Sequence, residues 1–201
     1  MKKAGYLSVF TGPMFSGKTS MVESKITCYA DIFEGRRVLM VNSILDKRDE
    51  ENLISCHSSS YTGLSRKIDV VTVLHLADVN AEKYSVIGVD ECQFFDDLVP
   101  RVEQWLTEGK HIYCAGLDSD ANLKRFGHIH ELLYLADDFV KLNACCSLCL
   151  NEGNDMLALN NMTKAPFTGR RVGIQPGKEQ IDVGAEEKYL PLCRQHMIFT
   201  V

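Results

Sequence analysis

The residues best suited to chemistry form a glycine-rich segment near the N-terminus. The segment fits the pattern G-x-x-x-x-G-K-[S/T] and consists of Gly12, Pro13, Met14, Phe15, Ser16, Gly17, Lys18 and Thr19, with Ser20 after it. In this pattern the glycines let backbone N–H groups converge on phosphate oxygens, the lysine reaches the β- and γ-phosphates, and the final hydroxyl binds Mg²⁺. We therefore predict a site for ATP and Mg²⁺. A chance glycine-rich turn is the alternative, but the pattern is long and follows an apolar run.

Two acidic residues, Asp90 and Glu91, follow the apolar residues 86–89. Such a run indicates a buried strand that delivers a carboxylate at its carboxyl end, where ligands bind in open α/β sheets. We expect Asp90 to hold Mg²⁺ through water, because this ion keeps much of its hydration shell. Glu91 is a candidate to position or deprotonate an attacking hydroxyl or water near the γ-phosphate. The alternative is a surface acidic pair that caps the strand.

Two pairs of residues in the last third of the chain have the spacing of metal ligands. Cys146 and Cys149 form one C-x-x-[C/H] pair, and Cys193 and His196 form the other. Together they offer four soft ligands for a tetrahedral, structural Zn²⁺ site, which has no open position for chemistry. Cys145 competes as a ligand, but its spacing to Cys149 does not fit. A set of unrelated thiols with a surface histidine is the alternative.

Strands and helices must alternate to bring these residues together. Apolar runs predict strands at residues 6–10, 37–41, 69–74, 84–89, 111–115 and 139–142. Helical patterns cover residues 18–33, 98–106 and 129–135, and Gly35 and Gly109 are expected to end the first two. This alternation predicts an α/β domain with a mainly parallel sheet. Because cysteines and then a polar stretch begin near residue 143, we expect a nucleotide-binding domain at 1–142 and a zinc-binding subdomain at 143–201.

Length and composition limit the classes of function. The 201 residues are 45% hydrophobic, which suits one domain with a core and a small appendage. The net charge of −5 argues against a nucleic-acid partner, and the basic residues at 164–178 read better as a solvated loop. No stretch approaches the roughly 18–20 apolar residues of a membrane helix, so we expect neither a membrane partner nor a signal peptide. Eight cysteines without a secretion signal favour a cytoplasmic protein and metal binding over disulfides.

Taken in order, several segments resemble the type II thymidine kinases. They are the glycine-rich segment, Asp-Glu-Cys-Gln-Phe-Phe at 90–95, Gly-Leu-Asp at 116–118 with Phe-Gly at 126–127, Val-Lys-Leu at 140–142, and the two cysteine pairs. The resemblance implies a RecA-like P-loop domain with a mainly parallel sheet, a small zinc-binding subdomain and a lasso loop over the nucleoside. It also implies transfer of the γ-phosphoryl group of ATP to the 5′-hydroxyl of thymidine, a homotetramer, and feedback inhibition by thymidine triphosphate (dTTP).

The same resemblance implies roles for individual residues. Glu91 matches the general base, Lys18 and Arg48 match catalytic cations, and Asp46 matches an acid near the phosphates. On spacing alone, Asp46 and Arg48 suit a solvated turn equally well. The residues that match the lining of the thymidine site are Met14, Phe94, Leu117, Phe126, Thr168, Val183, Gly184 and Tyr189. Ala121 stands where many members have an aromatic residue, and about a dozen extra residues at 151–164 lengthen the segment before Thr168.

Two other functions fit parts of the sequence. A RecA-like P-loop ATPase with a structural zinc ribbon would use Glu91 to activate water, and its ATP turnover would not depend on a nucleoside. A zinc-ribbon module that binds nucleic acid or protein is a third interpretation, which the acidic balance of the chain disfavours.

Overall fold

The computed structural model describes residues 4–32, 37–46, 68–152, 163–171 and 187–199. Gly35, Arg48, Val183 and Gly184 lie outside these ranges, as do residues 153–162 of the extra segment. The expectations for these residues therefore stay predictions.

Six parallel strands form the central sheet, as the alternation of strands and helices predicted. They are β1 (Tyr6–Thr11), β2 (Val38–Ser43), β3 (Ile68–Val73), β4 (Val86–Val89), β5 (His111–Gly116) and β6 (Asp138–Lys141). Their spatial order is β3-β2-β4-β5-β1-β6, and every neighbouring pair is parallel. Burial on both faces explains the nearly continuous apolar runs of β1, β4 and β5. The α/β class with a mainly parallel sheet is confirmed.

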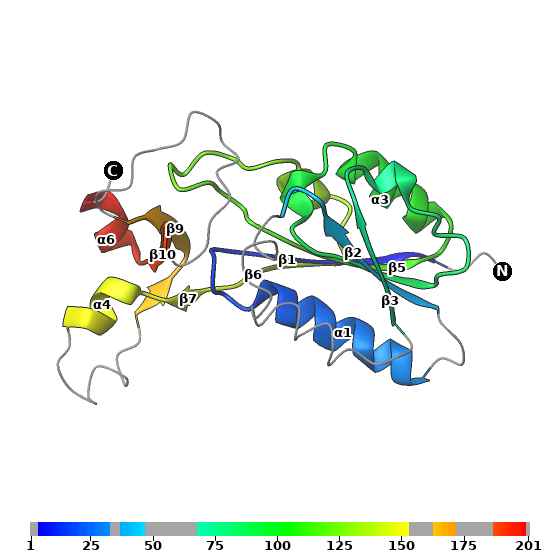
Figure 1. Ribbon diagram of the computed structural model, residues 1–201, viewed down its shortest axis with the longest axis horizontal. Helices are drawn as coiled ribbons and strands as arrows, with labels where there is room; N and C mark the ends of the chain where they lie inside the picture. Colours follow the sequence, from blue (N-terminus) through cyan, green and yellow to red (C-terminus); the bar gives the residue numbers. More distant parts are fainter. Residues whose placement is uncertain (1–3, 33–36, 47–67, 153–162, 172–186, 200–201) are drawn as a thin grey trace.

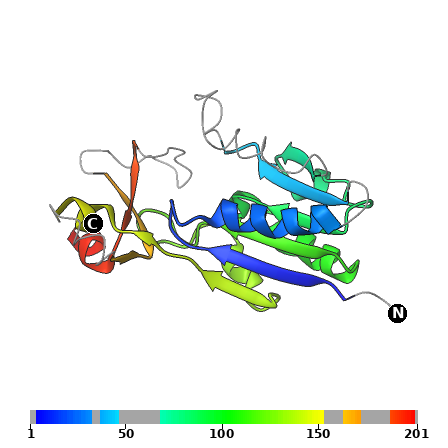
Figure 2. The ribbon, with the colours of Figure 1, turned by 90° about the horizontal axis from the view of Figure 1, so that it is seen from below.

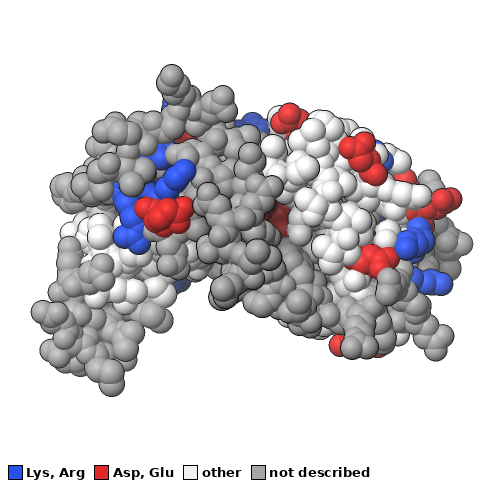
Figure 3. Space-filling view, in the orientation of Figure 1, with Lys and Arg blue, Asp and Glu red and all other residues white. Residues whose placement is uncertain are grey.

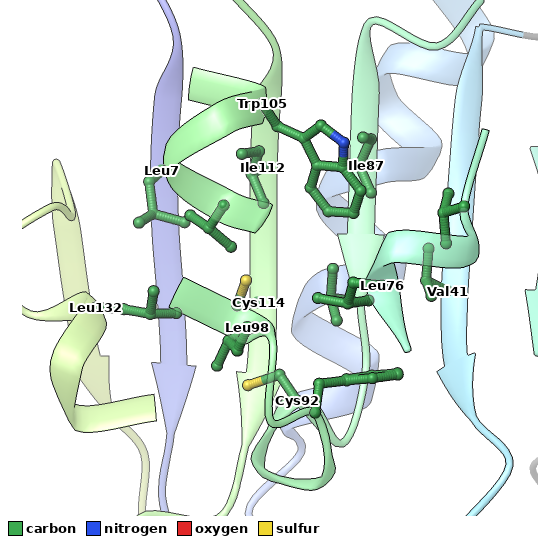
Figure 4. Packing of buried hydrophobic residues seen from close by; sticks show 14 of the residues in the cluster. Leu7, Val41, Leu76, Ile87, Cys92, Leu98, Trp105, Ile112, Cys114 and Leu132 are labelled. Carbon is green, nitrogen blue, oxygen red and sulfur yellow. The ribbon is translucent and has the colours of Figure 1, made fainter. Parts of the chain in front are cut away.

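Helical elements cover the two faces of the sheet. Helix α1 (Lys18–Ile32) lies on one face, and α3 (Leu98–Thr107) lies on the other (Figure 1). Three short 3₁₀ turns accompany α3: η2 (Leu76–Asp78), η3 (Cys92–Phe94) and η4 (Ile129–Leu132). Figure 4 shows the core on the α3 side, where Trp105 of α3 packs over Ile112 and Ile87 of the sheet. This two-sided cover leaves the carboxyl ends of the strands to hold the site.

Helix α3 illustrates how the sequence directs local structure. Its buried residues Leu98, Val102 and Trp105 recur at the spacing of one helical face. Gly109 follows the helix with a φ of 80°, and its N–H donates to Leu106 O at 3.0 Å. A glycine adopts this left-handed conformation at little cost, so Gly109 stops the helix as predicted.

The helix predicted at residues 129–135 is shorter than expected. Only Ile129–Leu132 is helical, and it is a 3₁₀ turn. The two buried residues of this turn, Ile129 and Leu132, are three apart, which suits a helix of three residues per turn. Leu133 and Tyr134 are 61% and 70% exposed, so an α-helix continued through them would bury no further apolar face.

A smaller lobe follows β6 and lies beyond the carboxyl ends of the strands (Figures 1 and 2). Its described residues form two short antiparallel strand pairs and two helices. They are β7 (Ala144–Cys145) with β8 (Lys164–Ala165), β9 (Phe167–Arg170) with β10 (Tyr189–Leu192), α4 (Ser147–Glu152) and α6 (Arg194–Phe199). Its own core consists of Cys146, Ala165, Leu192, Cys193 and Met197. A core this small needs a further cross-link to be stable.

The surface offers two general observations. On the face shown in Figure 3, described basic and acidic side chains are interspersed on both the sheet domain and the smaller lobe. Among the helices that the structure describes, none combines the length and apolar character required to cross a bilayer.

Candidate functional site

The glycine-rich segment forms the turn between β1 and α1. Three of its residues have positive φ angles: Gly12 at 142°, Phe15 at 64° and Gly17 at 78°. A Cβ atom on Gly12 would lie 2.5 Å from Leu142 O, so only glycine fits there. Left-handed residues within such a loop can turn successive backbone N–H groups toward one side, which creates a concave site for anions. The segment thus has the local shape that a phosphate-binding loop requires.

Lys18 is the first residue of α1 and lies over this loop. Its ammonium donates to Pro13 O at 2.7 Å, and the side chain is buried. The hydroxyl of Ser16 donates to the same carbonyl at 2.8 Å. The ammonium is therefore held at the mouth of the loop, at the N-terminal end of a helix, where anions are favoured.

Thr19 and Asp90 meet although they are far apart in sequence. The Thr19 hydroxyl donates to Asp90 Oδ2 at 2.8 Å, while the other carboxylate oxygen accepts the Glu91 N–H at 3.0 Å. The N–H of Asp90 donates to Val41 O at 2.9 Å, which ties the end of β4 to β2. Hydroxyl and carboxylate oxygens are the hard ligands that Mg²⁺ prefers, so this pair fits a magnesium site.

Glu91 has an unusual backbone and a buried side chain. Its φ and ψ are 46° and 41°, in the left-handed region that non-glycine residues seldom adopt. Its carboxylate oxygen Oε2 accepts a hydrogen bond of 2.7 Å from Gln93 Nε2. Strained backbone of this kind often occurs at functional sites. The acid is therefore held in place by both the backbone turn and a neutral amide.

Gln93 is a residue of the site that the sequence analysis missed. It is almost fully buried, at 3% exposure, in the turn η3 between two largely apolar neighbours. A buried amide needs partners for its oxygen and its N–H groups, so a glutamine inside an apolar stretch could have indicated a specific hydrogen-bonding role. Without the fold, however, its partners could not be named.

An aromatic pair lies next to these acids. The rings of Phe94 and Phe126 meet edge to face, with centroids 5.7 Å apart and an interplanar angle of 86°. The loop before Phe126 is ordered by Asp120, whose Oδ1 accepts the N–H groups of Asn122 and Lys124 at 2.9 Å. The fold makes this loop a fixed support for one side of the aromatic pair.

Thr168 brings the smaller lobe into contact with the phosphate loop. Its hydroxyl oxygen accepts the Met14 N–H at 2.9 Å, and Thr168 is buried. Tyr189 is also buried, on β10, where it pairs with Arg170 of β9 and lies under its guanidinium. Asp46 lies in the turn after β2, where its N–H donates to Ser43 O. A direct hydrogen bond therefore joins β9 of the smaller lobe to the glycine-rich segment.

Two cysteines beside the acids are not candidates for nucleophilic chemistry. Cys92 and Cys114 are fully buried, and Figure 4 shows them in the core between η3 and β5. Burial, followed by the neighbouring Cys114 thiol, raises the pKa of Cys92 well above its ordinary value. The thiolate is the reactive form, so a cysteine in this setting is chemically inert.

The four predicted metal ligands converge in the smaller lobe. His196 Nδ1 lies 3.3 Å from Cys146 Sγ, 3.5 Å from Cys149 Sγ and 3.3 Å from Cys193 Sγ, and all four ligand atoms lie within 4.8 Å of one another. A tetrahedral Zn²⁺ with ordinary bond lengths places its sulfurs about 3.8 Å apart and each sulfur about 3.6 Å from the nitrogen. The Cys149–Cys193 separation is 3.9 Å. The cluster therefore fits zinc, and Cys146 rather than Cys145 belongs to it.

The electrostatics of the cluster also suit a cation. Burial alone would raise the pKa of Cys146, but the N–H groups of Cys149 and Cys193 and the His196 ring outweigh it and lower the pKa to about 6. The pKa of Cys149 is raised, because its burial and the neighbouring sulfurs of Cys146 and Cys193 outweigh the hydrogen bond with Thr163 that lowers it. When three thiols lie this close together, the second and third lose their protons only if a metal ion compensates the negative charge.

Comparison with known proteins places the whole chain in one family. A family model described as "Thymidine kinase" matches residues 5–197. The chain belongs to the thymidine kinase family. This match spans the phosphate loop, the acidic pair, the aromatic pair and all four metal ligands, and it confirms the resemblance found in the sequence.

Individual thymidine kinases are similar to nearly the full length of this chain. The "Thymidine kinase" of Choristoneura fumiferana entomopoxvirus is 30% identical over 194 residues, which cover 94% of each chain. That of fowlpox virus is 30% identical over 197 residues and 96% of each chain. "Thymidine kinase a" of Arabidopsis thaliana is 30% identical over 199 residues, or 97% of this chain and 76% of the relative. The similarity thus extends over both lobes.

Proposed function

We propose that this protein is a thymidine kinase that transfers the γ-phosphoryl group of ATP to the 5′-hydroxyl of thymidine, giving dTMP and ADP. One observation carries the proposal within the family. The phosphate loop with Lys18, the Thr19–Asp90 pair and the buried Glu91 converge at the carboxyl ends of β1 and β4. Phosphoryl transfer needs this combination of positioning and compensating charge more than covalent chemistry by the protein.

The phosphate loop would bind the triphosphate of ATP. Backbone N–H groups of residues 12–19 would receive the phosphate oxygens, and Lys18 would exchange its bond to Pro13 for one to the β- and γ-phosphates. Mg²⁺ would be held by Thr19 directly and by Asp90 through water, and it would compensate charge on the phosphates. Arg48 and Asp46 would act beside the phosphates, by resemblance to the family.

Glu91 would act as the general base. As the 5′-oxygen forms its bond to the γ-phosphorus, the carboxylate accepts the hydroxyl proton, and the electrons of the broken P–O bond go to the β-phosphate of ADP. The proton then passes from Glu91 to solvent. A positioned base contributes about 10²–10⁴-fold to such a reaction.

Thymidine would lie between the acids and the smaller lobe. Phe94 and Phe126 supply an aromatic wall, while Met14, Leu117, Thr168 and Tyr189 complete the proposed lining with Val183 and Gly184. The Thr168–Met14 hydrogen bond supports this placement, because it brings the smaller lobe to the edge of the phosphate loop. Apolar walls combined with hydrogen bonds to the base edge give strong discrimination among bases.

Zinc would have a structural role in the smaller lobe. Four protein ligands leave no open position on the ion, so it would hold β10, α4 and α6 together and perform no chemistry. We also propose the division into a nucleotide domain at 1–142 and a zinc subdomain at 143–201, since β6 ends at Lys141 and β7 begins at Ala144. A cytoplasmic homotetramer inhibited by dTTP is inferred from the family.

The test is an assay of purified protein with ATP, Mg²⁺ and a panel of nucleosides, in which phosphorylated nucleoside and ADP are measured together. Thymidine should be phosphorylated, with ADP and dTMP formed in equal amounts. Glu91→Gln should lower kcat by about 10²–10⁴-fold and leave ATP binding nearly unchanged. ATP hydrolysis that does not depend on a nucleoside would support an ATPase instead. Near wild-type turnover by Glu91→Gln would remove Glu91 from its proposed role.

A further inference from the structure

Gln93 joins two strand ends that lie on either side of the proposed reaction centre. Its Nε2 donates to Glu91 Oε2 at 2.7 Å, just after β4, and its Oε1 accepts the Leu117 N–H at 3.0 Å, just after β5. Leu117 belongs to the proposed nucleoside pocket. One side chain therefore connects the proposed base with the wall of the pocket.

The direction of the amide follows from its partners. A backbone N–H can only donate, so the atom facing Leu117 must be the amide oxygen. The amide nitrogen then faces Glu91, and because an amide N–H can only donate, the Glu91 carboxyl oxygen must accept. Neither bond can be reversed without leaving a buried polar group unpaired, which is costly. Gln93 consequently favours a single orientation of the Glu91 carboxylate.

The surrounding backbone leaves room for this amide and little else. A Cβ on Gly116 would lie 2.6 Å from Gln93 Oε1, and a Cβ on Gly127 would lie 2.2 Å from Gln93 O. Gly127 also has a φ of 56°, which favours glycine. Gly116 thus packs against the side chain of Gln93 and Gly127 against its backbone, and Gln93 as a whole is 3% exposed. Such close packing limits the rotamers that Gln93 can adopt.

We propose that Gln93 is a positioning residue that orients the Glu91 carboxylate toward the nucleoside hydroxyl and anchors that orientation on the backbone of Leu117. The inference rests on the proposed function, in which Glu91 is the base. Glu91 needs such a partner because its left-handed backbone alone directs only the start of the side chain. Gln93 itself does not touch the reacting atoms, so its effect should appear in turnover rather than in substrate binding.

The experiment compares Gln93→Met with wild type in the full-length protein with zinc bound. Methionine keeps the length of the side chain but removes both hydrogen bonds. We expect kcat to fall by about 10–100-fold, the range typical of residues that orient a catalytic group. KM for thymidine and Kd for ATP should stay within about threefold of wild type, because the polar loss lies outside both binding surfaces. Gln104→Met, at an exposed glutamine of α3, is the matched control and should behave as wild type.

A second variant keeps the test independent of folding losses. Gln93→Glu has nearly the same shape and retains the acceptor for Leu117, but it faces Glu91 with an acceptor instead of a donor. It should lose at least as much kcat as Gln93→Met. Unfolding temperatures of both variants, measured with and without ATP, separate a folded enzyme with slow turnover from an unstable one.

Three results would overturn this inference. The first is an unchanged kcat in both Gln93 variants. The second is a parallel loss of kcat, thymidine affinity, ATP affinity and stability, which would indicate a purely structural role. The third is a milder effect of Gln93→Glu than of Gln93→Met. If wild type fails to phosphorylate thymidine, or Glu91→Gln retains turnover, the proposed function fails and this inference fails with it. If only the Gln93 variants behave as wild type, the proposed function stands and the inference alone is wrong.

Discussion

The hydrogen bond between Thr168 and Met14 allows a quantitative test of how the smaller lobe supports the phosphate loop. Thr168 Oγ1 accepts the Met14 N–H at 2.9 Å, and both residues are at least nine-tenths buried. Thr168→Val keeps the β-branched shape that suits strand β9 but removes the acceptor. The Met14 N–H is then left buried without this partner.

The expected loss follows from that missing partner. A buried donor left unsatisfied costs about 1–3 kcal/mol of folding free energy. For a chain of this size, each kcal/mol lowers the unfolding temperature by about 2–4 °C, so Tm should fall by about 2–12 °C. Because Met14 belongs to the phosphate loop, part of the loss should appear in ATP binding as an increase in Kd of about 3–10-fold.

Thr168→Ser is the matched control because it retains the hydroxyl and loses only a methyl group. We expect it to keep the ATP affinity of wild type and to lose less than about 1 kcal/mol of stability. Differential scanning fluorimetry gives Tm, and isothermal titration calorimetry with ATP and Mg²⁺ gives Kd. The reasoning is refuted if Thr168→Val matches wild type in both quantities. It is equally refuted if Thr168→Ser weakens ATP binding as much as Thr168→Val does.

Two further predictions concern the metal site and the sheet edge. Cys149→Ser should lower the bound zinc from about one ion per chain to well below half and reduce Tm, whereas Cys145→Ser should keep the zinc. Elemental analysis measures the zinc content, and a folded, active preparation without zinc would contradict the prediction. The hydrogen bond from Tyr6 to Asp138, with burial adding to it, raises the pKa of Tyr6 to about 12. Because the pKa of Tyr6 is higher in the folded than in the unfolded protein, the bond adds stability below pH about 10, and this stability is lost as the pH rises toward 12. In urea unfolding, the difference in stability between wild type and Tyr6→Phe should therefore shrink across that pH range. A constant difference would argue against the bond.

Most of the candidate site was predictable because its signals are local. The glycine-rich segment is contiguous, so its loop shape and the helix after it follow from neighbouring residues. The acids Asp90 and Glu91 follow a short apolar run that indicated a buried strand, and the structure has β4 there. The C-x-x-[C/H] spacing placed the four metal ligands on two short segments, and a metal ion accounts for their convergence. Family resemblance then joined these local signals into one function.

Other parts depended on contacts between distant segments. Gln93 could not be assigned a role, because its distant partner, the Leu117 N–H, is brought to it only when β4 and β5 lie side by side. The short length of η4 was also not predicted from the sequence, because the burial of Ile129 and Leu132 depends on the core against which they pack. The role of Asp120 was not predicted, although its carboxylate accepts the N–H groups of Asn122 and Lys124 and so organises the loop before Phe126.

The sequence by itself determined which chemical groups this protein offers: a glycine-rich segment with a lysine and a hydroxyl, two acids after a strand, and four soft metal ligands. These depend on residue type and short spacing, which the chain carries directly. The tertiary structure alone decided how the groups face one another. The Thr19–Asp90 contact, the bond from the Leu117 N–H to Gln93 and the bond from the Met14 N–H to Thr168 all join residues from different elements. Their geometry exists only after the sheet has brought the carboxyl ends of its strands together.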